Sequence, residues 1–131
     1  MAAKTAFVTG GASGIGRALA EELAEQGVEV VLADRQIGLA EEVATAIRRA
    51  GGHATAHALD VRDSAQFQRV VDETVARTGR IDYFFNNAGI GVGGDMARYE
   101  MRDWNDVIDV NLRGVVHGIQ HFVPRMPEAN R

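Results

Sequence analysis

The residues whose types and spacing could carry chemistry begin with one glycine-rich segment. It runs Thr9-Gly10-Gly11-Ala12-Ser13-Gly14-Ile15-Gly16, between a short apolar run and an amphipathic stretch. A glycine-rich turn there lets the backbone reverse tightly, leaves space for a pyrophosphate and lets the following helix pack closely on a sheet. The free N–H groups and positive dipole end of that helix attract the anion. The competing interpretation is a purely structural turn. We predict cofactor contacts from five residues: Gly10, Ser13, Gly14, Ile15 and Gly16.

A carboxylate follows this segment at an informative distance. Asp34 closes the second apolar run, 18 residues beyond Gly16, close to the roughly 20 residues that separate such a loop from a ribose-binding acid. A carboxylate there accepts hydrogen bonds from both adenosine ribose hydroxyls and repels a 2′-phosphate. Asp34 therefore predicts NAD rather than NADP, although the neighbouring Arg35 could accommodate that phosphate. The alternative for Asp34 is a turn residue at the end of a strand.

Length and composition exclude several classes of protein. A chain of 131 residues is one domain's worth. The formal net charge of -4 argues against a nucleic-acid partner. The absence of cysteine excludes disulfides, thiolate metal sites and cysteine nucleophiles. No apolar run approaches the roughly 20 residues of a membrane span. We expect a soluble, cytoplasmic domain over residues 1–131, with neither membrane nor nucleic acid as partner.

The elements that must position these residues alternate along the chain. Short apolar runs predict strands near 7–8, 28–33, 54–59 and 81–85, and helical spacing marks 15–23, 39–50, 67–75 and 104–122. Gly27, Gly51 and Gly79 mark helix ends, and Ser64 is the predicted N-cap of the third helix. Strict alternation predicts a doubly wound parallel α/β sheet, Rossmann-like, with about four strands.

The fourth helical pattern carries three further expectations. It is expected to bend near Asn111, a poor helix former, and to bury Trp104 in the core. His117 and His121 have a spacing that can bind metal, but no third ligand stands beside them. We predict no metal site there and expect both histidines to face solvent or a partner.

The glycine-rich segment and three later motifs resemble the short-chain dehydrogenase/reductase family. The spacing Thr-Gly-x-x-x-Gly-x-Gly is similar to that family's cofactor loop, and the other motifs follow in its order: Asp60-Val61, Asn86-Asn87-Ala88-Gly89 and Asn111. The resemblance implies that Asp34 binds ribose and that Asp60 and Val61 contact adenine. It also implies that Asn87, Ala88 and Gly89 stabilise the central sheet beside the cofactor, and that Asn111 holds a water of the proton relay.

The chain departs from the family at the catalytic group. The family uses a serine, a tyrosine and a lysine four residues after the tyrosine. Here Tyr83 and Tyr99 are followed four residues later by Asn87 and Asp103, and the sole lysine is Lys4. The carry-over of catalytic residues is therefore limited to Asn111. We expect the N-terminal, cofactor-binding half of such an enzyme, truncated before the catalytic segment and inactive alone.

Three functions remain open at this point. The first is an NAD-dependent oxidoreductase that transfers a hydride to or from an alcohol or ketone substrate, expected as a homo-oligomer. The second is a non-catalytic dinucleotide sensor or interaction module. The third is a methyltransferase, against which Asn86-Asn87-Ala88-Gly89 argues. In the first case the 81–85 strand would be an exposed apolar edge and the last helix would lose packing surface.

Overall fold

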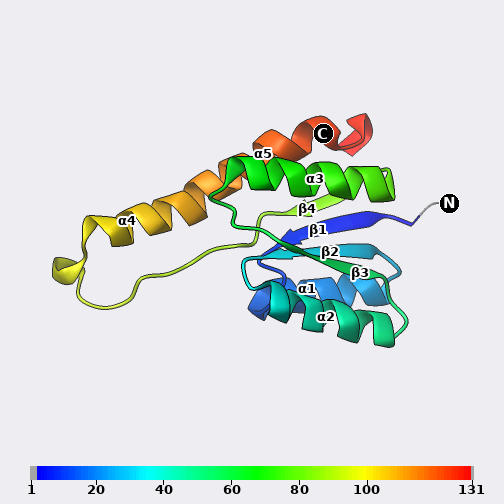
Figure 1. The fold of residues 1–131 in the computed structure, drawn as a ribbon, viewed down its shortest axis with the longest axis horizontal. Helices are drawn as coiled ribbons and strands as arrows, with labels where there is room; N and C mark the ends of the chain where they lie inside the picture. Colours follow the sequence, from blue (N-terminus) through cyan, green and yellow to red (C-terminus); the bar gives the residue numbers. More distant parts are fainter. Residues whose placement is uncertain (1–2, 131) are drawn as a thin grey trace.

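The computed structural model describes residues 3–130 as strands and helices in strict alternation up to the fourth strand (Figure 1). The strands are β1 (Thr5–Thr9), β2 (Glu29–Asp34), β3 (Ala54–Ala58) and β4 (Tyr83–Phe85). The helices are α1 (Gly14–Glu25), α2 (Ile37–Arg49), α3 (Ser64–Thr78), α4 (Met101–Ile108) and α5 (Gly114–Phe122). A π-helical segment, η2 (Asp109–Arg113), joins α4 to α5, and short 3-10 turns are η1 (Met96–Arg98), η3 (Val123–Arg125) and η4 (Glu128–Asn130).

The four strands form one parallel sheet in the order β3-β2-β1-β4. In the central strand β1, Phe7 pairs with Val31 of β2 on one side and with Phe84 of β4 on the other. The chain winds outward from β1 to β3 and then returns to the opposite side of β1. Sheets of this kind bind ligands where the winding reverses, beyond the carboxyl ends of the strands. The predicted doubly wound sheet is confirmed, with β4 as an edge strand among the described residues.

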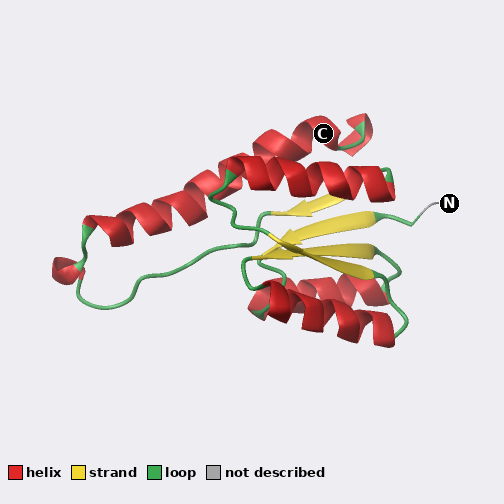
Figure 2. Ribbon diagram, viewed as in Figure 1, coloured by secondary structure: helices red, strands yellow, loops and turns green. Residues whose placement is uncertain are grey.

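Helices cover both faces of the sheet (Figure 2). Along β1, Phe7 joins the core beneath α3 and α5, whereas Val8 joins the core over α1 and α2. The alternation follows from the two-residue period of a strand. A strand buried on both faces reads as a continuous apolar run, which is the pattern the sequence shows.

Glycines end the helices as predicted, but one helix start differs. Gly79 is the C-cap of α3 with a φ of 77°, a left-handed conformation that glycine adopts without steric cost. The N-cap of α3 is Asp63 rather than Ser64, because the Asp63 carboxylate accepts the N–H of Gln66. Ser64 is the first helical residue. An ionised carboxylate also complements the positive end of the helix.

The segment α4–η2–α5 forms a continuous helical arm, which projects from the sheet at its α4 end (Figure 1). At Asn111, where a bend was expected, the helix continues as the π-helical turn η2. The prediction for Trp104 is wrong: its side chain is 42% exposed and packs edge-on against Tyr99. The arm reaches the core through Phe122 of α5 and Val110 of η2. No helix within residues 3–130 has the length and hydropathy to cross a membrane.

Candidate functional site

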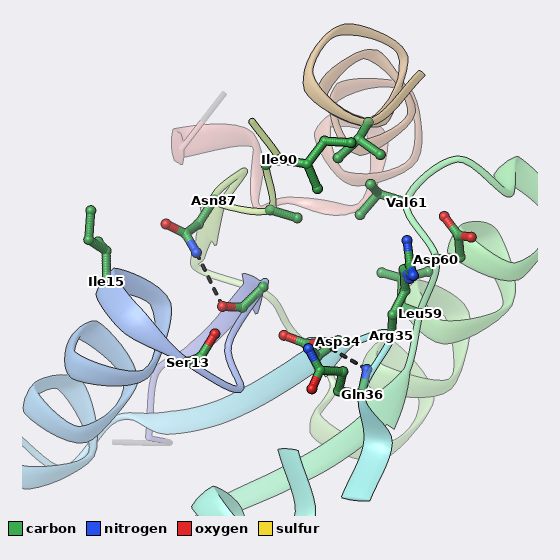
Figure 3. A pocket seen from close by; sticks show the side chains of 14 residues that line it. Ser13, Ile15, Asp34, Arg35, Gln36, Leu59, Asp60, Val61, Asn87 and Ile90 are labelled. Atoms are coloured by element: carbon green, nitrogen blue, oxygen red, sulfur yellow. Dashed lines mark hydrogen bonds between the residues drawn. The ribbon is translucent and has the colours of Figure 1, made fainter. Parts of the chain in front are cut away.

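A cavity of about 430 Å³ lies at the carboxyl ends of the strands (Figure 3). The glycine-rich turn and Asn87 form one of its sides, and Asp60 and Val61 form another. Its lining residues come from all four strand-to-helix connections and from the arm: Gly10, Ser13, Ile15, Asp34, Arg35, Gln36, Leu59, Asp60, Val61, Asn87, Ala88, Gly89, Ile90 and Val110. Its size suits a small molecule or cofactor.

The glycine-rich turn brings α1 very close to β1. A Cβ atom on Gly16 would lie 2.2 Å from the carbonyl oxygen of Gly10, so only glycine permits this approach. The N-cap residue Ser13 makes no side-chain cap, and the first turn of α1 contains no acid. The positive end of α1 is therefore left without an anionic side chain of its own, next to the cavity.

Asp34 presents its carboxylate at the end of β2. Its Oδ2 accepts the N–H of Ala12 at 3.1 Å, and its Oδ1 accepts the N–H of Gln36 at 2.9 Å. These two bonds fix the carboxylate between the turn and the start of α2, and the bond to Gln36 is drawn in Figure 3. Each oxygen keeps acceptor capacity for a ligand hydroxyl, because a carboxylate offers about four acceptor positions. Arg35 lines the same cavity.

Thr9 and Asn87 join β1 to β4 behind the cavity. The Thr9 hydroxyl oxygen accepts the N–H groups of Asn87 and Ala88, each at 3.0 Å, and donates to Phe85 O. The Asn87 amide donates to the carbonyl oxygens of Thr9 and Gly10. The expectation that Asn87 stabilises the central sheet agrees with these contacts. Thr9 opens the motif Thr-Gly-x-x-x-Gly-x-Gly, which was the signal for its role.

The connection after β3 holds Asp60 as an ionised group. The side-chain hydrogen bonds from Arg62 lower the pKa of Asp60, and this effect outweighs the opposing effect of burial. Arg62 also lies 3.5 Å from the Asp106 carboxylate on α4. The loop that carries Asp60 and Val61 is thus connected to the helical arm.

The side-chain amide of Asn111 forms two hydrogen bonds with the backbone of Ile90. Its Oδ1 accepts the N–H of Ile90 at 2.8 Å, and its Nδ2 donates to the Ile90 carbonyl, also at 2.8 Å. The partner of this amide is the backbone of the segment after β4. The same oxygen lies behind Gly89, where a Cβ atom would be 3.3 Å away. Asn111 therefore holds the wall of the cavity rather than lining it.

Comparison with known proteins decides the family. The family model described as short chain dehydrogenase matches residues 4–131. The chain belongs to the short-chain dehydrogenase family.

Three proteins of this family illustrate the similarity in sequence and in structure. The uncharacterized oxidoreductase YxbG of Bacillus subtilis is 38% identical over 126 residues, which are 95% of this chain and 46% of that protein. A short-chain dehydrogenase/reductase from Burkholderia phymatum, solved with NAD, has a TM-score of 0.93 at 38% identity over 99% of this chain and 46% of that one. A metagenomic short-chain oxidoreductase solved with NADP has a TM-score of 0.88 at 34% identity, covering 95% of this chain and 57% of that one. The chain spans about half the length of the curated relatives it matches.

The family's dinucleotide fits the residues that surround the cavity. The uncompensated end of α1 suits a pyrophosphate, and the fixed carboxylate of Asp34 suits ribose hydroxyls. Because Gly16 must be a glycine, no side chain at this position fills the space beside the start of α1. A short-chain dehydrogenase that retains these features has the means to hold the adenosine side of its cofactor.

The structure brings together ten of the thirteen residues predicted for the site. Gly14, Gly16 and Asn111 are the three that do not line the cavity. Sequence reasoning missed Gln36, Leu59, Ile90 and Val110, each of which lies within two residues of a predicted one. The signal was their position at the ends of strands or beside a motif.

The chain's single lysine is bound far from the cavity. Lys4 Nζ donates to the Tyr83 hydroxyl at 2.8 Å, and this hydrogen bond raises the pKa of Lys4. That pair sits at the amino ends of β1 and β4, opposite the carboxyl ends where the cavity lies.

Both histidines are partly exposed and contact residues of the same chain. His117 contacts the Val61 carbonyl and His121 contacts the Ser64 hydroxyl. Burial lowers the pKa of His121. Within residues 3–130 no three histidine, aspartate or glutamate side chains are grouped to hold a metal ion.

Proposed function

We propose that this chain forms the cofactor-binding part of an NAD-dependent oxidoreductase, which transfers a hydride between the cofactor and an alcohol or ketone. When bound, the dinucleotide supplies the nicotinamide that accepts or donates the hydride. The family membership supports the class of reaction, and the fixed carboxylate of Asp34 carries the choice of NAD. A cytoplasmic location belongs to the same proposal.

The residues of this chain are assigned to the adenosine side. The N–H groups at the start of α1, beside Ser13, bind the pyrophosphate, and Asp34 accepts the ribose hydroxyls. Asp60 and Val61 bind the adenine base. Asn111 orients the wall formed by Ile90 and, by resemblance, holds a water for proton transfer. The chain lacks a Tyr-x-x-x-Lys sequence, and we expect no turnover from residues 1–131 alone.

Relative affinity for NAD and NADP tests the role of Asp34. A carboxylate close to a 2′-phosphate repels it, so we expect NAD to bind at least about tenfold more tightly than NADP. Asp34→Ser should narrow this preference, and adding Arg35→Ala should then weaken NADP again, because Arg35 is the cation beside the ribose site. Glu42→Ser, which removes an exposed acid on α2, is the matched control. Isothermal titration calorimetry gives each dissociation constant. Equal affinity of the unaltered protein for both dinucleotides would contradict the choice of NAD.

The helical arm supports the proposal of a homo-oligomer. Its large apolar side chains repeat along one face and remain exposed, from Met101 at 70% to Leu112 at 60% and Ile119 at 54%. Contiguous apolar surface of this kind marks an interaction site. We expect self-association in sedimentation velocity and its loss in the double variant Leu112→Asp, Ile119→Asp. A monodisperse monomer of full stability would overturn this proposal.

A further inference from the structure

The backbone N–H groups of the loop Leu59–Asp63 are hydrogen-bonded, with one exception. The N–H of Leu59 bonds to the carbonyl of Asp34, the N–H of Asp60 to the side chain of Gln66, and the N–H groups of Arg62 and Asp63 to Asp60 itself. The N–H of Val61 has no hydrogen-bond partner among residues 3–130, and Val61 lines the cavity. A buried donor without a protein partner suits a ligand acceptor.

Two residues of α5, one helical turn apart, contact Val61. His117 Nδ1 lies 2.7 Å from the Val61 carbonyl oxygen. A carbonyl only accepts, so Nδ1 carries the proton and donates it. At Gly114 a Cβ atom would lie 2.6 Å from Val61 Cγ2, so the absence of a side chain there makes room for Val61. Residues three apart on a helix share one face, and this face of α5 therefore holds both the carbonyl and the side chain of Val61.

We infer that His117 is a positioning residue for recognition of the adenine base, an inference that rests on the proposed function. With the carbonyl and the side chain of Val61 both held by α5, its backbone cannot turn freely, and its unpaired N–H keeps one direction in the cavity wall. Such an N–H pairs with a purine whose N1 is an unprotonated acceptor, as in adenine. It does not pair with hypoxanthine, whose N1 carries a hydrogen. His117 thereby contributes to selection of the base without contacting it.

The helical arm connects this contact to the other wall of the cavity. Asn111, six residues before His117 on the same arm, binds both backbone groups of Ile90. Arg62 adds an exposed ionic link from the loop to Asp106 on α4, which solvent screens strongly. The bond from His117 is part-buried and is the closest polar contact between the arm and the loop. Its loss should therefore loosen the base site more than the loss of the ionic link.

Calorimetric titration with ADP and IDP tests the inference, because the two nucleotides differ only in the base. We expect the unaltered protein to bind ADP about tenfold more tightly than IDP. His117→Phe removes the donor, and loss of about one hydrogen bond should weaken ADP binding about fivefold and lower the IDP/ADP ratio of dissociation constants from about ten to about two. His117→Asn, whose amide can replace Nδ1–H, should restore the ratio to within twofold.

The controls separate this inference from a general structural effect. His121→Phe makes the same change one turn further on, where the bond goes to Ser64, and should keep the original ratio. His117→Leu replaces the phenylalanine variant if that variant does not fold. An unchanged ratio in the donor-free variant, or equal weakening of both nucleotides, would overturn the role of His117. Failure of the unaltered protein to bind either nucleotide would instead refute the proposed function.

Discussion

The two faces of the sheet are built from different side chains and do different work. Six of the eleven buried residues in the core over α1 and α2 are alanines: Ala12, Ala20, Ala24, Ala40, Ala44 and Ala54. The core beneath α3 and α5 is aromatic, and there the rings of Phe84 and Phe122 stack 3.6 Å apart with Phe7 and Phe67 around them. Small residues allow backbone to approach backbone, as at Gly16, and this fixes the glycine-rich turn. The phenylalanine rings hold the helical arm against the sheet, and the outer face of the arm remains exposed to solvent.

We expect the largest loss of stability from a substitution in the aromatic core beneath α3 and α5. Phe122 is fully buried and is the main anchor of α5. Phe122→Ala should lower the free energy of unfolding by about 3–5 kcal/mol, because it removes a buried ring and leaves a cavity. Ile119→Ala, on the exposed face of the same helix, should change it by about 0.5 kcal/mol or less in the monomer. Urea titration measures both. Equal effects would mean that the arm is not anchored as described.

Glycine-to-alanine substitutions compare the two faces directly. A new Cβ on Gly16 meets the backbone of Gly10, which cannot move without the turn, and should cost about 2–3 kcal/mol. On the aromatic face, Gly118→Ala meets the side chains of Asn86 and Phe84, which can shift in part, so a smaller cost is expected.

Gly38 is the control for these two substitutions. It lies in α2 with no atom near a new Cβ, so Gly38→Ala should stabilise the protein by about 0.5–1 kcal/mol. Thermal unfolding ranks the three variants. If Gly118→Ala cost more than Gly16→Ala, the contrast between a rigid and an adjustable face would be wrong.

A buried acid connects β1 and β4 at their amino ends. Asp82 accepts the N–H of Thr5 at 2.8 Å and is held by Arg80. Burial acts to raise the pKa of Asp82, but the hydrogen bonds from Arg80 and Thr5 outweigh it, and the pKa is lowered. A lowered pKa stabilises the fold above the unfolded-state value of about 3.9, and this stabilisation is lost as pH falls through the folded value.

Asp82→Asn therefore has a pH-dependent effect. It should cost about 1–2 kcal/mol at pH 7 and progressively less as the pH falls below about 3.9 towards the lowered pKa of Asp82 in the folded protein. Urea unfolding at pH 7 and pH 3 measures the difference, with Glu42→Gln on the exposed surface as control. A cost that stays constant with pH would show that the charge of Asp82 does not contribute.

Local spacing predicts the elements of this chain and most of its site, but not what covers each face. The strands were recognised because runs such as 28–33 are apolar throughout, as central parallel strands are. The turn and Asp34 were found because their chemistry is local. The arm has the same apolar period as the buried helices, yet Leu112 is exposed, because periodicity does not say what packs against a face. The contact between His117 and Val61 joins residues 56 positions apart, which no local spacing encodes.

We expect ADP-ribose to bind at the carboxyl ends of the strands. Residue-resolved NMR tests this binding most directly. In a ¹⁵N–¹H titration of this 14.1 kDa chain, the account predicts saturable shifts at Gly10, Ser13, Asp34, Val61 and Ala88. The second cavity, between α1 and α2 near Glu21 and Gly52, should remain unperturbed. Shifts confined to that second cavity, or no shifts at millimolar ligand, would contradict the account.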